Sequence, residues 1–322
     1  TSRTGCIRTG PLAEVHVRIR TCLLTLSFVL TVHMAYAQQG AAQPGQPAEV
    51  KVTMTKLGGN VYAVDGQGGR MAALVGAEGV FLVDAQFPAV TEKIVAAIKE
   101  ISPAPIKFLV NTHVHGDHSG GNENFAKLGV TVLGRPNLRN RLLKPVAAPN
   151  GQVPPVAPPL ALPVVLYDHP TTVMMNGETV QLIPLPNAHT DGDTAVKFVQ
   201  GDVLMTGDVF RSVGFPAADR NNGGTLKGLL ESIETFISLS GPNTRVVPGH
   251  GPITDRAALV FHREVIVTVR DRVAKAISEG KTLEQVRELK PTADFEQRVG
   301  GPPNFITQFV DTLYAELSVG RR

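Results

Sequence analysis

Short hydrophobic runs separated by turn-forming residues make up the chain just after residue 50. The runs NVYAV from Asn60, MAALV from Met71 and VFLVD from Val80 are divided by stretches rich in Gly and Asp. This pattern predicts a meander of antiparallel strands. Over residues 88–101 the period changes, because apolar side chains there recur at helical spacing. That spacing predicts an amphipathic helix packed on a sheet.

Strand-like and helix-like segments alternate through the rest of the chain. Strands are predicted at 106–110, 130–133, 180–185, 194–199, 202–207 and 245–249. Helices are predicted at 136–143, 225–239 and 255–279, with two more near Thr282 and Asn304. A mixed order of hairpins and strand–helix units predicts sheets covered by helices, in an α/β layered domain.

Residues 144–163 interrupt this alternation, because they contain seven prolines. Proline is excluded from helix interiors and central strands, so neither element is predicted here. Two interpretations remain open for this segment: a surface excursion, or a loop that flanks the active site.

The first 37 residues have the pattern of a secretory signal peptide. Two arginines precede the apolar run 22–32, and an A-x-A cleavage site follows it at 35–37. The run is too short to span a bilayer, although a single membrane anchor is the alternative. We therefore expect cleavage after Ala37, a periplasmic or secreted protein without stable membrane insertion, and a flexible linker over 38–50.

Removing residues 1–37 changes the charge and the cysteine content of the protein. This segment holds four arginines and one glutamate, so the rest of the chain has equal numbers of basic and acidic residues. No overall basic field is left for a nucleic acid, and we expect a small-molecule substrate. Cys6 and Cys22 are the only cysteines, and both lie in this segment. Any metal must therefore be held by histidine and carboxylate.

The densest group of metal-binding residue types follows the predicted strand 106–110. His113, His115, Asp117 and His118 fall within six positions of the stretch NTHVHGDHSGG. His113 and His115 share one face of an extended backbone, and Gly116 then lets the chain turn. Four nitrogen and oxygen ligands in so short a stretch predict a metal site.

Three further candidate ligands follow other predicted strands. They are His189, Asp208 and His250, and each lies beside a glycine or a turn. His169 and His262 lack such a setting, since one precedes a proline in a loop and the other falls inside a predicted helix. We interpret these two histidines as structural or surface residues.

The order and spacing of these seven ligands resemble the metallo-β-lactamase superfamily across roughly residues 51–255. The segments AHTDGDTAVKF and PGHGPITDRAAL further resemble a group of exported members described as β-lactamase-like or cyclase-like. The resemblance implies a four-layer αββα sandwich, with residues 51–322 as one catalytic domain ending in helices. It also implies a site for two metal ions, usually Zn²⁺.

The resemblance further implies how the ligands divide between the two metals. His113, His115 and His189 would hold the first metal, Asp117, His118 and His250 the second, and Asp208 would bridge them. A metal-bound hydroxide would then attack an activated carbonyl, and Asp117 could also act catalytically by orienting this nucleophile. Ligation by nitrogen and oxygen alone leaves Fe and Mn as alternatives to Zn²⁺.

The same residues leave the substrate open. Many exported β-lactamases of the superfamily carry a cysteine where this chain has Asp208, and the full set of five histidines and two aspartates resembles the lactonase and glyoxalase II branches, which cleave lactones and thioesters. Arg211 favours β-lactams as the substrate class, because an arginine three residues after Asp208 could pair with a substrate carboxylate. The alternative for Arg211 is a salt-bridged or solvated side chain. Asn222 could offer an amide donor to the substrate.

We therefore expect a dinuclear zinc metallohydrolase, with β-lactam hydrolysis first and lactone or thioester hydrolysis next. A non-hydrolytic periplasmic protein that binds metal or relays redox equivalents is the alternative from another class.

Overall fold

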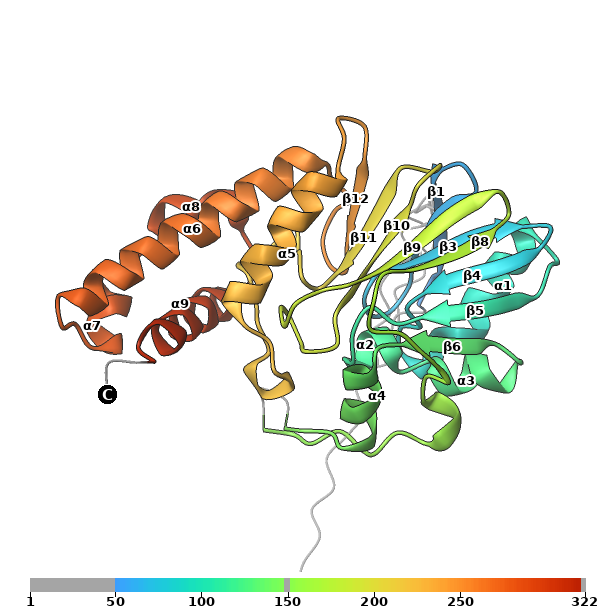
Figure 1. Ribbon diagram of the computed structural model, residues 1–322, viewed down its shortest axis with the longest axis horizontal. Helices are drawn as coiled ribbons and strands as arrows, with labels where there is room; N and C mark the ends of the chain where they lie inside the picture. Colours follow the sequence, from blue (N-terminus) through green and yellow to red (C-terminus); the bar gives the residue numbers. More distant parts are fainter. Residues whose placement is uncertain (1–49, 148–150, 320–322) are drawn as a thin grey trace, which may run out of the picture. The chain divides into compact units, whose positions relative to one another are not determined.

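Two β-sheets stacked face to face form the centre of the fold (Figure 1). This computed structural model describes residues 50–147 and 151–319. The predicted signal peptide, and all but the last residue of the predicted linker 38–50, lie outside the described residues. Within the described ranges, no helix is long and apolar enough to cross a membrane.

The first sheet combines an antiparallel meander with a parallel half. In order, its strands are β1 (Thr53–Gly58), β2 (Val61–Asp65), β3 (Met71–Gly76), β4 (Gly79–Val83), β5 (Ile106–Val110), β6 (Thr131–Gly134) and β7 (Val165–Leu166). Strands β1 to β4 pair antiparallel, as the hairpin pattern predicted, and β4 to β7 pair parallel. The carboxyl ends of β4, β5 and β6 therefore meet at one edge.

The second sheet is mostly antiparallel. Its strands are β8 (Thr171–Met175), β9 (Glu178–Pro184), β10 (Thr194–Phe198), β11 (Val203–Gly207) and β12 (Arg245–Pro248). Their order is β12-β11-β10-β9-β8, and only β11 and β12 run parallel. The carboxyl ends of β11 and β12 thus lie side by side.

Apolar side chains from both sheets fill the space between them. Phe81 and Val110 of the first sheet belong to the same buried cluster as Val196, Phe198 and Met205 of the second. Strands β10 and β11 are buried along their whole length, because helices cover the outer face of their sheet. Burial on both faces explains why these strands read as continuous apolar runs.

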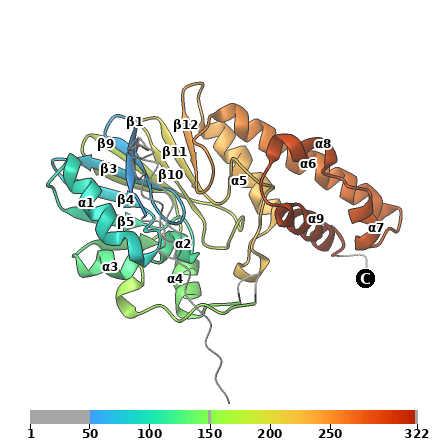
Figure 2. The same cartoon turned by 180° about the vertical axis from the view of Figure 1, so that it is seen from behind.

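Helices form the two outer layers (Figure 2). They are α1 (Thr91–Ile101), α2 (Gly116–Ser119), α3 (Asn122–Lys127), α4 (Pro136–Leu143), α5 (Leu226–Leu239), α6 (Arg256–Ser278), α7 (Leu283–Glu288), α8 (Ala293–Val299) and α9 (Pro303–Leu317), with short 3₁₀ turns at Pro88–Val90, Pro159–Ala161 and Arg220–Asn222. Ile94 and Ile98 of α1 pack on the first sheet. Helix α5 packs on the second sheet through residues such as Phe236, and α6 and α9 pack against α5 and each other in the same apolar cluster, through residues such as Val265 and Phe309. The predicted four-layer αββα sandwich is confirmed.

A few elements escape the hydrophobic pattern. β1 and β8 alternate exposed with partly buried positions, so their sequences TMTKLG and TTVMM lack a continuous apolar run. The predicted helix over 88–101 begins with a 3₁₀ turn at its proline and becomes α-helical only at Thr91. Helix α8 is short and buries only Phe295 of its own residues, which leaves little periodicity to detect.

Candidate metal centre

The seven predicted metal ligands come together where strands of the two sheets end. His113 and His115 lie in the loop after β5, and Asp117 and His118 lie in α2. The other three, His189, Asp208 and His250, follow β9, β11 and β12 in the opposite sheet. The site therefore draws its ligands from both sheets.

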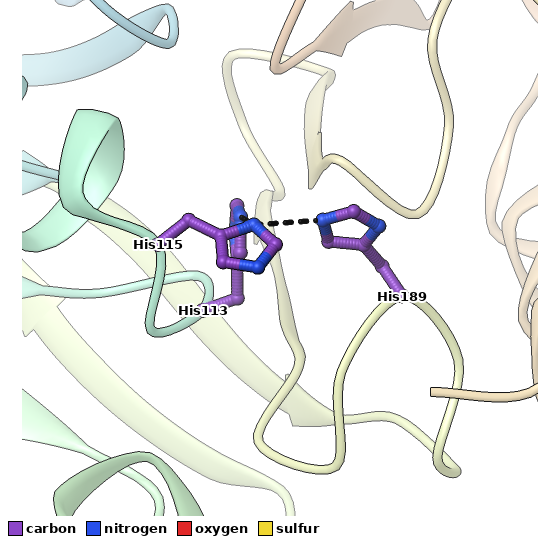
Figure 3. A group of neighbouring side chains, drawn as sticks. All are labelled: His113, His115 and His189. Carbon is purple, nitrogen blue, oxygen red and sulfur yellow. Dashed lines mark hydrogen bonds between the residues drawn. The ribbon is translucent and has the colours of Figure 1, made fainter. Parts of the chain in front are cut away.

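Three histidine rings converge on one point (Figure 3). Nδ1 of His115 lies 3.2 Å from Nε2 of His113 and 3.0 Å from Nε2 of His189. His113 and His115 come from one side of the site, and His189 reaches them from a loop on the other side (Figure 3). These three side chains can hold a single metal ion.

A second group of ligands adjoins the first and contains the carboxylates. Nε2 of His118 lies 3.2 Å from Oδ1 of Asp208 and 3.6 Å from Oδ2 of Asp117. Nε2 of His250 lies 3.0 Å from Asp117 and 3.3 Å from Oδ2 of Asp208. Asp208 also faces His189 at 3.8 Å, so its two oxygens lie between the two groups.

Four of the histidine rings make a hydrogen bond through the nitrogen that points away from the centre of the site, and these bonds indicate which nitrogen of each ring carries the proton. The donor pairs are His113 to the Thr112 hydroxyl (3.1 Å), His115 to Asp219 (2.9 Å), His118 to Asp84 (2.8 Å) and His189 to the Ala217 carbonyl (2.7 Å). A neutral imidazole has only one N–H, so each ring then presents a lone pair to the centre. Lone pairs only about 3 Å apart repel each other unless a cation lies between them. The donor set therefore fits a metal ion.

Two further features keep room for a cation. Nε2 of His118 and Oδ1 of Asp208 are buried, and neither makes a hydrogen bond of regular geometry within the described residues. A Cβ atom at Gly249 would lie 2.0 Å from Oδ1 of Asp208, and one at Gly69 would lie 2.0 Å from Cε1 of His118. Glycine at these two positions lets the backbone approach the ligands closely.

The electrostatics differ between the two groups. Burial and the neighbouring His115 lower the pKa of His189 to about 4, and burial with His118 and His115 lowers the pKa of His113 well below its usual value. Hydrogen bonds to Asp117 and Asp208 raise the pKa of His250 to about 9, although burial opposes this. Burial thus keeps His113 and His189 neutral. In the second group the carboxylates act the other way, because Asp208 and Asp84 raise the pKa of His118 against the effect of burial. A metal ion bound there would compete with these protons for the ring nitrogens.

Comparison with known proteins agrees with this geometry. A sequence profile described as the metallo-beta-lactamase superfamily matches residues 57–252, which contain all seven ligands.

The chain belongs to the metallo-β-lactamase superfamily.

Solved structures show the same fold. A metallo-β-lactamase from Pontibacter korlensis has a TM-score of 0.55 and 21% identity, covering 67% of this chain and 99% of that one. The metallo-β-lactamase FIM-1 from Pseudomonas aeruginosa in its mono-zinc form has a TM-score of 0.56 and 18% identity, covering 69% of this chain and 97% of that one.

One relative by sequence is the beta-lactamase-like protein 2 homolog of Caenorhabditis elegans. It is 26% identical over 178 residues, which are 54% of this chain and 53% of the relative, so the chain spans about half the length of that protein. Members of the superfamily are mostly metal-dependent hydrolases and generally bind zinc. The His/Asp groups of this chain could hold a metal of this kind.

In this superfamily member, the sequence prediction missed two aspartates that orient ligand histidines. Asp84 is fully buried directly after β4, accepts from His118, and also accepts from the backbone N–H and hydroxyl of Thr112. Its φ of 68° is unusual for a residue other than glycine. Its place at the end of the run VFLVD was the available signal. Asp219 had no such signal, because it lies 104 residues from His115 in the sequence.

Asn222, predicted to contact substrate, contacts a residue that supports the metal centre. Its amide donates to Oδ2 of Asp219 at 2.8 Å, and Asp219 in turn accepts from His115. The side chain therefore supports a histidine ligand and is already engaged. The neighbouring Asn221 donates to the carbonyl of Ala147 at 2.8 Å. Each of these hydrogen bonds uses one of the two N–H groups of its amide, and the substrate contact of Asn222 stays a prediction.

A cavity of about 450 Å³ opens above the ligands, within the usual size range of small-molecule sites. Arg211 lines it, with a 10% exposed side chain that lies 3.5 Å from Oδ2 of Asp208 and stacks 4.3 Å from the ring centre of Phe305. Phe305 belongs to α9, which also contributes Asn304, Gln308 and Thr312 to the lining at helical spacing. No sequence signal linked α9 to the site.

His262 is structural, in agreement with its setting in the sequence. Its ring is buried in α6 and packs edge-on against Phe210, with ring centres 5.0 Å apart. Burial and the charge of Arg211 lower its pKa to about 3. The imidazole therefore stays neutral in the folded protein throughout the pH range in which a free histidine titrates.

His262→Phe is expected to reduce acid sensitivity. An unfolded histidine has a pKa of about 6.5, so the stability contributed by neutral His262 is present above pH 6.5 and is lost as the pH falls towards 3. Between pH 7.5 and pH 5.0 the native chain should lose about 2 kcal/mol more unfolding free energy than His262→Phe. Urea unfolding at both pH values measures this. His169→Phe, at an exposed histidine, is the matched control and should follow the native chain; identical pH dependence for all three proteins would contradict the expectation.

Proposed function

We propose that this chain is an exported dinuclear zinc metallohydrolase that opens the activated carbonyl of a small molecule. β-Lactams are the first substrate class proposed, and lactones or thioesters are the alternative. The observation that carries the proposal is the overlap of three His/Asp groups, with ligand atoms within 4.8 Å of one another, at the base of an open cavity. Export rests on the leader pattern of residues 1–37.

The fit of the ligands to two zinc ions supports a hydrolytic role. Zn²⁺ held there would supply a Lewis acid for the carbonyl and lower the pKa of water from about 15.7 to about 7. Asp117 lines the cavity with a side chain that is 25% exposed, so its carboxylate can orient a water molecule and accept its proton. Asp208 is buried beneath it and is better placed to hold metal than to meet substrate.

Cationic side chains at the cavity favour a substrate that carries an anionic group. Arg211 and Arg220 both line it. Arg211 is held from behind by the ring of Phe305 and from one side by Asp208, so its guanidinium has a defined position. A carboxylate beside the scissile bond, as in a penicillin, could pair with such a guanidinium.

The test combines zinc quantitation with a hydrolysis panel on protein without residues 1–37. The panel contains nitrocefin, benzylpenicillin, γ- and δ-lactones and an acyl thioester. We expect about two zinc ions per chain and turnover of at least one class, and loss of turnover when zinc is removed with a chelator. Stoichiometric zinc without turnover of any class would overturn the proposal and favour a metal-binding or redox-relay role.

Arg211→Ala is expected to raise KM for a carboxylate-bearing lactam about tenfold or more, because the substrate loses one charged hydrogen-bond partner. For an uncharged lactone, KM should stay within about twofold of the native value. Steady-state kinetics on both substrates measures the difference. Arg263→Ala is the control, because Arg263 of α6 forms a surface ion pair with Glu234 of α5 and does not line the cavity. Equal KM changes for both substrates would rule out an anchoring role.

A further inference from the structure

Residues 145–146 and 154–158 of the Pro-rich segment form one wall of a second cavity beside the metal centre. In Figure 1 the part of this segment from residue 151 on, in light green, runs along the bottom of the view. The cavity has a volume of about 450 Å³, and its wall includes Pro154, Pro155, Val156 and Pro158. Residues 151–160 are exposed except for Ala157, so this part of the segment is a surface loop that also lines a cavity beside the site.

Hydrogen bonds attach the segment to the rest of the fold. The N–H of Ala157 donates to the carbonyl of Leu142 at the end of α4 (3.0 Å). The carbonyl of Ala161 accepts from the buried amide of Asn122 in α3 (3.0 Å). Pro158 and Pro159, with fixed φ, further restrict the backbone between these two points. The cavity wall is thus built in advance of any ligand.

The lining of this cavity is apolar, and its charged members already have partners. Arg141 pairs with Asp191 at 2.7 Å, and Glu123 pairs with Lys127 at 2.9 Å. Asp219 is engaged by His115 and by the amide of Asn222, as described above. Each charged side chain of this lining is thus paired within the described residues, and most of the other lining residues are apolar.

The two cavities share His115 and Asp219 in their walls. A ligand held over His115 therefore has the guanidinium of Arg211 in one cavity and apolar side chains in the other. We propose that the Pro-rich cavity is a subsite for an uncharged hydrophobic substituent of the substrate, such as an acyl chain or an aromatic ring, while the anionic end of the same molecule lies in the Arg211 cavity. This inference rests on the proposed function in taking the metal centre as the reaction site.

N-acylglycines are suitable probes, because each has a carboxylate and an acyl chain but no activated carbonyl to be hydrolysed. Calorimetry on the zinc-loaded protein measures the Kd of the acetyl, butanoyl, hexanoyl and octanoyl members. We expect the Kd to fall about two- to fourfold with each added methylene until the cavity is filled. A Kd that does not change with chain length would overturn the proposal.

Two valines of the segment provide a matched pair of variants. Val156 lines the cavity and Val153 does not, yet both side chains are 61% exposed, so the fold should tolerate the same substitution at each. Val156→Asp is expected to weaken octanoylglycine about tenfold or more and to leave acetylglycine within about twofold. Val153→Asp is expected to change neither. Equal weakening by both variants would overturn the proposal.

Ala157→Phe tests the same cavity without adding charge. A phenyl ring there occupies part of the space, so octanoylglycine should bind more weakly and acetylglycine should not. Equal loss for both probes would count against the subsite. All these measurements follow binding alone, so they remain decisive whichever substrate class the hydrolysis panel identifies. A hydrolysis panel that fails while chain-length dependence persists would remove the proposed function but leave the apolar cavity as a ligand site.

Discussion

In zinc-loaded protein carrying Asp208→Asn, bound zinc is expected to fall from about two ions per chain to about one or fewer, with turnover reduced about 100-fold or more. Asp208 is the carboxylate that faces both groups of the site, with contacts to His118, His250 and His189. An amide keeps the shape of the carboxylate but has no negative charge, and it cannot bridge two dications. Plasma emission spectrometry of dialysed protein, together with the best substrate of the panel, measures both effects.

Asp202→Asn is the matched control for this prediction. Asp202 lies just before β11 and Asp208 just after it, so the same substitution is made at opposite ends of one strand. Asp202 pairs with Lys197 at 2.6 Å and is distant from the ligands. Asp202→Asn should leave bound zinc and turnover unchanged and alter the free energy of unfolding by roughly 1 kcal/mol at most. If Asp208→Asn retained two zinc ions, the bridging role would be wrong.

Asp84→Ala is expected to destabilise the fold and the metal centre together. The buried carboxylate accepts from His118 and from the backbone and hydroxyl of Thr112. Removing it leaves these three donors without their acceptor, so the unfolding free energy should fall by about 3 kcal/mol or more. Chemical unfolding at pH 7.5 measures this change.

Asp84→Asn separates orientation of the histidine from stability. The amide retains one acceptor oxygen for Thr112 but carries no charge opposite His118. We expect a stability much closer to that of the native chain, and a zinc affinity about 10- to 100-fold lower, as is usual when a partner of a metal-bound histidine is lost. Competition with a chromophoric chelator measures the affinity. Native affinity in Asp84→Asn would show that His118 is oriented without this carboxylate.

The sequence alone predicted the layers, most of the elements and all seven residues that converge. Ligands such as His113, Asp208 and His250 can be recognised in the sequence because each follows an apolar strand. The carboxyl ends of parallel strands lie at the same edge of a sheet, so residues that follow them come close together. The profile match and the structural likeness confirm the family and the fold. The roles given to individual ligands remain predictions that the substitutions above test.

Other parts of the site had no local signal. Asp219 meets His115 across more than a hundred residues, and α9 reaches the cavity from the end of the chain. Such contacts depend on how the layers pack against one another. The spacing of apolar residues along the chain predicts the elements but not this packing. The hydrogen bond from the Asn222 amide to Asp219 likewise had no signal in the sequence, and its predicted contact with substrate stays a prediction.

Helix α9 lies beyond the part of the chain that the superfamily profile matches, which ends at residue 252. The predicted metal ligands and the α9 part of the cavity lining thus come from separate stretches of the sequence. Changes at Asn304, Gln308 or Thr312 could retune which molecules enter without disturbing a single ligand. Diversification of such an enzyme could proceed through its last helix while the metal centre stays constant, and a library confined to these three positions would be a small and direct way to select new substrate preferences.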